Sequence, residues 1–133
     1  MKDVALVVFA RAPVRGKVKT RLAAEVGAAR ATRAYAALLG LALARARGWQ
    51  GPRAIACSDD ASLGYFGALP QARGFRCFPQ EGEDLGARMR RAVQCALALA
   101  SAAILIGADI ADHAVGDLAA AGAALAQADV VLG

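Results

Sequence analysis

Paired cysteines and cysteine–histidine clusters are missing from this sequence of 133 residues. Its three cysteines, Cys57, Cys77 and Cys95, are far apart in apolar segments, form no C-x-x-C motif, and are accompanied by one histidine. This spacing argues against both a zinc-binding module and a disulfide-stabilised scaffold. Buried free thiols are the simpler interpretation, and they are typical of a reducing compartment, so we expect a cytoplasmic protein.

Long apolar runs are also missing. Ala34–Ala44 is apolar but short and bounded by arginines, and Ala92–Ala108 is interrupted by polar residues. Neither offers the ~20 consecutive apolar residues that a membrane-spanning helix needs. The N-terminus lacks the pattern of a signal peptide, because Asp3 lies where a basic flank belongs and Arg11 ends the apolar run. We therefore expect one soluble domain, in line with the usual domain length.

The common glycine-rich nucleotide motifs are missing as well. No G-x-G-x-x-G occurs, which disfavours a dinucleotide-binding fold. A P-loop would require G-x-x-x-x-G-K-[ST], but Gly16-Lys17 is followed by Val18, and Arg11 occupies the position of the first glycine. Aromatic residues make up 5% of the chain, and none is interleaved with the basic residues near the N-terminus. Binding of single-stranded nucleic acid is therefore disfavoured.

What the chain does have is a hydrophobic majority and an uneven charge. Hydrophobic residues make up 58% of it, which excludes a disordered protein. Residues 1–53 hold 11 Lys or Arg and 2 Asp or Glu, whereas residues 54–133 hold 5 and 9. This asymmetry suggests an anionic ligand near the basic part and a cation near the acidic part.

Short apolar runs alternate with helical patterns along the chain. We expect strands at Val4–Ala10, Arg53–Cys57, Phe75–Phe78, Ala102–Gly107 and Asp129–Leu132. We expect helices from Thr20 or Arg21 to about Arg47 with a break at Gly27, over Asp60–Ala68 after a Ser58 or Asp59 cap, over Asp84–Ala100, and from the loop Asp109–His113 to about Gln127.

This order predicts an α/β fold of three αβα layers, with a mostly parallel sheet, right-handed crossovers and a Rossmann-like arrangement. In such sheets ligands bind beyond the carboxyl ends of the strands, where the strand order reverses.

Five cations lie within eleven residues directly after the first expected strand: Arg11, Arg15, Lys17, Lys19 and Arg21. Pro13 and Gly16 can shape this loop so that backbone amides approach a ligand, and Thr20 can cap the helix that follows. A helix N-terminus and several cations favour a phosphate or pyrophosphate. The alternative is a solvated basic loop without a ligand.

A second group of residues follows the fourth expected strand, in the segment ILIGADIADH. Asp109 and Asp112 can hold Mg²⁺ or Mn²⁺, which bridge carboxylates to diphosphate oxygens. The alternative is that either aspartate only caps the next helix. His113, the one histidine, is more simply an exposed loop residue than a ligand or base.

A third group lies in PQEGEDLGARM, Pro79–Met89. Asp84 or Glu83 can cap the helix, Gly86 permits close approach of the backbone, and Arg88 can reach an anionic ligand. A capped surface helix with no ligand explains this segment equally well.

The segments VVFARAPVRGKVKTRLA, QEGEDLGARM, ILIGADIAD and ADVVLG, in this order, resemble a bacterial family of glycosyltransferase-like proteins. Its members have the A-type nucleotide-diphospho-sugar transferase fold and are often radical-SAM/selenodomain-associated transferases. The resemblance implies a site for a nucleotide-sugar or nucleoside triphosphate. Arg11, Lys17, Lys19 and Arg21 match basic family positions, Asp84 and Arg88 match the DLGxRM stretch, and Asp109 matches the aspartate near the metal and nucleotide.

The sequence also departs from this family. Arg11 and Arg15 stand where the family usually has Lys and Pro, and Ile110–His113 replaces its usual Cys-Pro-Asp-Leu. Family members continue beyond VVLG into a Gly-Gly-Tyr segment on the sugar and acceptor side, so residues 1–133 suggest a single domain truncated at its C-terminus.

Four functions therefore stay open. The first is metal-dependent transfer from a nucleotide-activated substrate, with glycosyl transfer ahead of nucleotidyl transfer. The second is a catalytically incomplete nucleotide-binding module or pseudoenzyme. The third is an interaction protein, for example a homo-oligomer, that uses the open edge of the fifth expected strand. Nucleic-acid binding is the weakest of the four.

Overall fold

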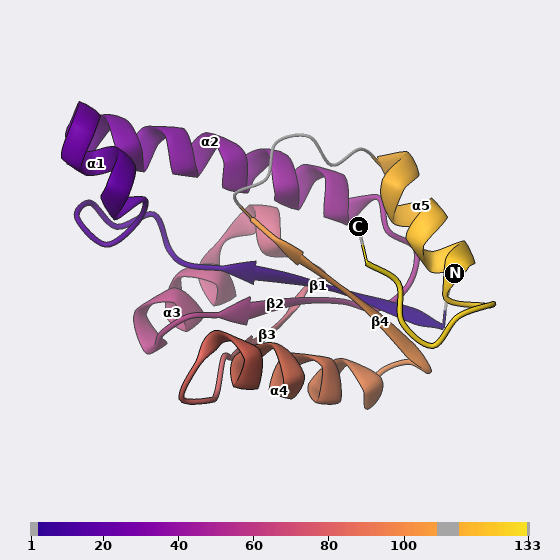
Figure 1. Cartoon of the computed structure of the whole chain (residues 1–133). Helices are drawn as coiled ribbons and strands as arrows, with labels where there is room; N and C mark the ends of the chain where they lie inside the picture. Colours follow the sequence, from indigo (N-terminus) through magenta and orange to yellow (C-terminus); the bar gives the residue numbers. More distant parts are fainter. Residues whose placement is uncertain (1–2, 109–114, 133) are drawn as a thin grey trace.

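The computed structural model describes residues 3–108 and 115–132, and these form an α/β fold (Figure 1). In chain order the elements are β1 (Val4–Ala10), α1 (Thr20–Val26), α2 (Ala28–Arg47), β2 (Arg53–Cys57), α3 (Asp60–Ala68), a 3-10 turn (Pro70–Ala72), β3 (Arg76–Pro79), α4 (Leu85–Leu97), β4 (Ala102–Gly107) and α5 (Val115–Ala124). The expected break between the first two helices is confirmed at Gly27, whose φ of 92° is a conformation that glycine adopts readily.

The four strands form one parallel sheet in the order β3-β2-β1-β4. Strand β1 lies in the middle, with Val8 opposite Ile55 of β2 on one side and Ile106 of β4 on the other. The chain builds outward from β1 to β2 and β3, then crosses back to add β4 on the opposite side. The strand order therefore reverses between β1 and β4, which is where open α/β sheets form a ligand crevice.

Helices cover both faces of the sheet, so the predicted three-layer architecture is confirmed (Figure 1). Alternate residues of a strand point to opposite faces. Leu6 and Val8 of β1 belong to a core shared with α2, α3 and α5, whereas Ala5 and Val7 pack against α4. All four side chains are fully buried, as is typical of an unbroken apolar run in a parallel strand that is covered on both faces.

The predicted fifth strand, Asp129–Leu132, is wrong. These residues are in no strand, and the side chains of Val130 and Leu132 are 74% and 91% exposed. A short β-branched run favours an extended backbone, but a strand also needs a paired neighbour, which sequence alone cannot guarantee. Within the described ranges, β4 pairs only with β1, so the open edge on this side of the sheet is β4 itself.

Several boundaries differ by a few residues from those predicted. Strand β3 begins at Arg76 instead of Phe75, helix α4 ends at Leu97 instead of Ala100, and α5 ends at Ala124 instead of Gln127. Thr20 is the first residue of α1 and not its cap; Lys19 occupies the cap position and makes no capping bond through its side chain. In the part of the chain that the structure describes, no helix is both long and apolar enough to cross a membrane.

Candidate functional site

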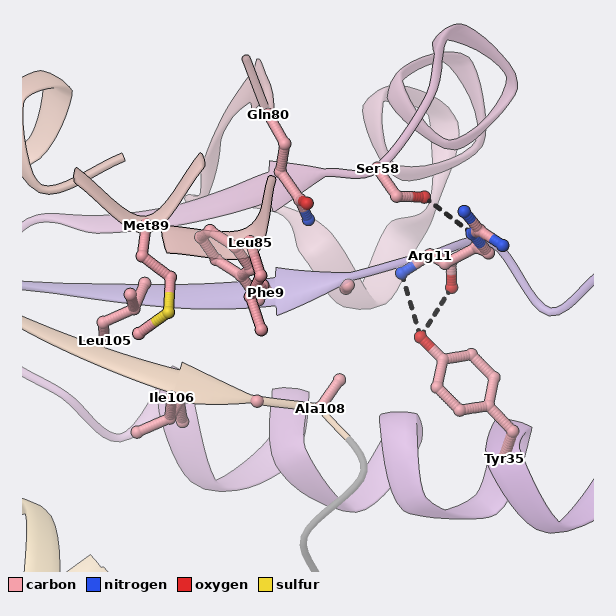
Figure 2. Close-up of a pocket in the computed structure, with 12 residues that line it drawn as sticks. Phe9, Arg11, Tyr35, Ser58, Gln80, Leu85, Met89, Leu105, Ile106 and Ala108 are labelled. Carbon is pink, nitrogen blue, oxygen red and sulfur yellow. Dashed lines mark hydrogen bonds between the residues drawn. The ribbon is translucent and has the colours of Figure 1, made fainter. Parts of the chain in front are cut away.

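A pocket of about 430 Å³ lies at the carboxyl ends of the strands, where the topology predicts a ligand crevice (Figure 2). Residues of β1 and β4 line it, together with the residue that directly follows each of the four strands. Its lining comprises Phe9, Ala10 and Arg11 at the end of β1, Ser58 directly after β2, Gln80 directly after β3, Leu105, Ile106, Gly107 and Ala108 at the end of β4, Tyr35 of α2, and Leu85 and Met89 of α4. Most of this lining is apolar, and the polar groups are few.

Arg11 forms the charged corner of the pocket. Its Nε donates a hydrogen bond to Ser58 Oγ at 3.0 Å, and its Nη1 donates to the carbonyl oxygen of Lys17 at 2.8 Å. The backbone N–H of Arg11 donates to the Tyr35 hydroxyl, which in turn donates to the Arg11 carbonyl oxygen. These bonds join the first loop to β2 and α2, and they fix a cation at the rim of the pocket.

Buried Ser62 supports the same corner from α3. Its Oγ accepts a hydrogen bond from the backbone N–H of Ala12 at 2.8 Å. Asp59 caps α3, as expected, by accepting from Ser62 N at 2.7 Å. Hydrogen bonds from Ser62 lower the pKa of Asp59, with smaller contributions from Arg11 and Lys17, so the carboxylate stays charged beside these cations.

Of the predicted diphosphate ligands, Arg11 is the one that lines this pocket among the residues described. Lys17 is connected to it through its carbonyl oxygen, but its side chain is exposed, as is that of Arg21. Gly16 has a φ of 83° and shapes the exposed turn, and Lys19 has a left-handed backbone at the start of α1. Gly16, Lys19 and Arg21 therefore do not form the wall of the pocket.

Asp84 and Arg88 form hydrogen bonds that stabilise the loop before α4. Asp84 Oδ1 caps the helix by accepting from Ala87 N at 2.7 Å, and Arg88 Nε donates to the carbonyl oxygen of Gly82 at 3.1 Å. Gly82 has a φ of 142°, and a Cβ added there would lie 2.8 Å from Ala87 Cβ. Neither Asp84 nor Arg88 lines the pocket, but the turn they hold places Leu85 against it.

The predicted metal ligands Asp109 and Asp112, together with His113, lie outside the described residues. Ala108, the residue before Asp109, is part of the pocket lining. Within residues 3–108 and 115–132, no three His, Cys, Asp or Glu side chains group to hold a metal ion. Carboxylates that follow Ala108 are suited by chemistry to Mg²⁺ or Mn²⁺, and the metal stays a prediction.

Three polar residues of the site were not predicted from the sequence: Tyr35, Ser58 as a ligand-facing residue, and Gln80. A signal existed for two of them, because Ser58 and Gln80 directly follow β2 and β3, just as Arg11 follows β1. Tyr35 lies within a long helix, and no local pattern marks it.

Cys57, Cys77 and Cys95 are free thiols, as expected, but burial holds for Cys57 and not for Cys77 and Cys95, which are partly exposed. Cys57 is fully buried, and this burial, with the neighbouring Cys77, raises its pKa to about 12. Burial also raises the pKa of Cys77. Neither thiol has the lowered pKa of a reactive cysteine.

The parallel order β3-β2-β1-β4, the two helical layers and the pocket at the carboxyl ends define a three-layer α/β fold with a candidate ligand site. A crystal structure of a "putative nucleotide-diphospho-sugar transferase" from Desulfovibrio desulfuricans G20 matches it with a TM-score of 0.80 and 28% sequence identity. The match covers 91% of this chain and 53% of that one, so this chain spans about half the length of its structural relative.

Residues 41–133 match the family DUF2064, described as "Uncharacterized protein conserved in bacteria", and the chain belongs to this family. No curated protein matches the chain.

Proposed function

We propose that this protein binds a nucleotide-activated sugar, or a nucleoside triphosphate, at the carboxyl ends of its strands and acts as a transferase, with glycosyl transfer as the first candidate reaction. One observation supports this most directly. The guanidinium group of Arg11 lies at the rim of an apolar pocket, at the point where the strand order reverses. The structural relative named as a nucleotide-diphospho-sugar transferase supports the same assignment.

In this proposal Arg11 binds the diphosphate. A guanidinium group has five N–H donors, and the hydrogen bonds to Ser58 and Lys17 use two of them. The remaining donors can bind phosphate oxygens, and charge-assisted bonds of this kind are stronger than neutral ones. Lys17, Lys19 and Arg21 add positive charge in the loop after β1 and at the start of α1, and Gly16 shapes the turn of the same loop.

Asp109 and Asp112 would hold a divalent cation, Mg²⁺ or Mn²⁺, beside the diphosphate. Such an ion neutralises charge that develops on a leaving diphosphate. Asp84 and Arg88 contribute in this proposal by fixing the turn before α4, and Arg88 also adds a positive charge on the same side.

Calorimetric titration with UDP-, GDP- and CDP-sugars, with and without Mn²⁺, tests the proposal. We expect at least one of them to bind below millimolar concentration, and Arg11→Ala to weaken that binding about tenfold or more, because a charge-assisted hydrogen bond is lost. Arg73→Ala is the matched control, because Arg73 is exposed and precedes β3, at the opposite end of the strands. Absence of binding by every nucleotide-sugar would contradict the proposal that a nucleotide-sugar is the ligand and glycosyl transfer the reaction.

An assay for transfer and hydrolysis on the nucleotide-sugar that binds then separates two outcomes. Turnover that requires the metal supports the transferase. Tight binding without turnover would restrict the function to a nucleotide-binding module.

A further inference from the structure

Gln80 has a fixed position and a fixed orientation in the pocket. Its backbone N–H donates to the carbonyl oxygen of Cys57 at 2.8 Å, and its side-chain Nε2 donates to the carbonyl oxygen of Ala56 at 2.9 Å. A carbonyl oxygen only accepts hydrogen bonds, so the nitrogen end of the amide must be the end that faces Ala56. The Oε1 end is left as an acceptor, and no residue within the described ranges donates a hydrogen bond to it.

The pocket beside Gln80 has an apolar end and a charged end. In Figure 2, Leu85, Met89 and Leu105 lie at one end and Arg11 and Ser58 at the other, with Gln80 between them. A ligand that matches these two ends has an apolar part with few polar groups for one end and an anionic part for the other. A sugar does not suit the apolar end, because its hydroxyls would lose water without gaining partners there.

Helix α4 exposes two large apolar side chains at that end. Leu85 is 64% exposed and Met89 is 41% exposed. They are four residues apart, so they lie on the same face of α4 and present one continuous apolar surface to the pocket. Contiguous exposed apolar surface beside a pocket is a feature of ligand-binding grooves. A planar aromatic ring covers such a surface efficiently.

We infer that Gln80 recognises the nucleobase of the bound nucleotide: the ring lies against Leu85 and Met89, and Gln80 Oε1 accepts a hydrogen bond from a ring or exocyclic N–H. This inference rests on the proposed function, since the diphosphate at Arg11 brings the base to the opposite end of the same pocket. Gln80 is then the residue that determines specificity for the base, while Arg11 provides affinity that does not depend on the base.

The test compares nucleoside diphosphates with a probe that has no base. Calorimetry measures the affinities of ADP, GDP, CDP, UDP and ribose 5-diphosphate for the full chain. We expect at least one nucleoside diphosphate to bind tenfold or more tightly than ribose 5-diphosphate. Gln80→Met should weaken the preferred nucleotide about three- to tenfold, the effect of one hydrogen bond, and leave ribose 5-diphosphate unchanged. Gln94→Met is the matched control, because Gln94 is exposed on α4 outside this pocket.

A second variant keeps the test valid if Gln80→Met fails to fold. Leu85→Ala removes a side chain that is already 64% exposed, so the fold should tolerate it, and it should weaken the nucleotide but not ribose 5-diphosphate. Leu97→Ala is its control, because Leu97 is 48% exposed at the far end of the same helix.

Two results would overturn the inference and leave the proposed function intact. One is equal binding of ribose 5-diphosphate and every nucleoside diphosphate. The other is an equal loss of both kinds of ligand in the Gln80 and Leu85 variants, which would indicate a merely structural role. Failure of every diphosphate to bind would overturn the proposed function and the inference together.

Discussion

The hydroxyl of Tyr35 accepts a hydrogen bond from the backbone N–H of Arg11 at 2.9 Å and donates one to the carbonyl oxygen of the same residue at 2.8 Å. The buried side chain of Tyr35 in α2 therefore forms hydrogen bonds with both polar backbone groups of Arg11, which directly follows β1. Arg11 is consequently held at the pocket rim from its backbone as well as from its guanidinium group.

Tyr35→Phe should remove both backbone bonds and leave the ring in place. We expect the free energy of unfolding to fall by about 1–3 kcal/mol, because partly buried polar groups lose their partners. Nucleotide affinity should fall several-fold as Arg11 becomes less ordered. Urea denaturation and calorimetry measure the two effects. Tyr65→Phe is the control, since Tyr65 is 38% exposed and makes an edge-to-face contact with Phe66 that phenylalanine preserves. Equal effects of the two variants would contradict the role given to Tyr35.

Gly82→Ala should disturb the turn that places α4 against the pocket. The φ of 142° is unfavourable for alanine, and the new Cβ would lie 2.8 Å from both Ala87 Cβ and Arg88 N. We expect a loss of about 1–3 kcal/mol of stability, the usual cost of such a backbone strain. Gly86→Ala is the control from the same segment, because its Cβ would meet Asp84 Oδ1 at an ordinary 3.5 Å and alanine favours the helix. A thermal melt in which both variants match the parent would argue against this account of the turn.

The raised pKa of Cys57 predicts how its contribution to stability varies with pH. The thiol titrates near pH 9 when unfolded and near 12 when folded, so above pH 9 the unfolded state loses its proton first. The stabilising contribution is therefore complete below pH 9 and is lost as the pH rises toward 12, at up to about 1.4 kcal/mol per pH unit. Urea denaturation at pH 7 to 10.5 should show the difference between the parent and Cys57→Ala shrinking above pH 9. A difference that stays constant over this range would contradict the burial argument.

Much of the fold could be predicted because most strands are short apolar runs, and β1 and β2 are buried on both faces. Unbroken runs such as Val4–Ala10 and Ala102–Gly107 give a strong local signal, and the helices between them fix a parallel sheet. Asp129–Leu132 has the same local composition and is not a strand, because pairing depends on a neighbour that no local pattern encodes.

The sequence predicted where the candidate site lies better than it predicted which residues form it. The rule that ligands bind after the strands led to Arg11, and applied to every strand it would also have led to Ser58 and Gln80. It could not lead to Tyr35, whose role depends on how α2 packs against the end of β1. Composition alone made every cation of the first loop a candidate ligand. Folding brings Arg11 into the pocket wall and leaves Lys17 and Arg21 outside it, at the surface.

Asp84 is the residue for which a structural role and a binding role can be separated most directly. Its Oδ1 accepts from Ala87 N at 2.7 Å, so Asp84→Ala should lower stability by about 0.5–2 kcal/mol through loss of the helix cap. Asp84→Ser restores a cap without a charge. If Asp84 acts only through the turn, Asp84→Ser should recover both the stability and the nucleotide affinity of the parent. Recovery of stability with a nucleotide affinity still several-fold too low would show that the carboxylate itself acts on the ligand or its metal. Urea denaturation and calorimetry on the same three proteins distinguish these outcomes.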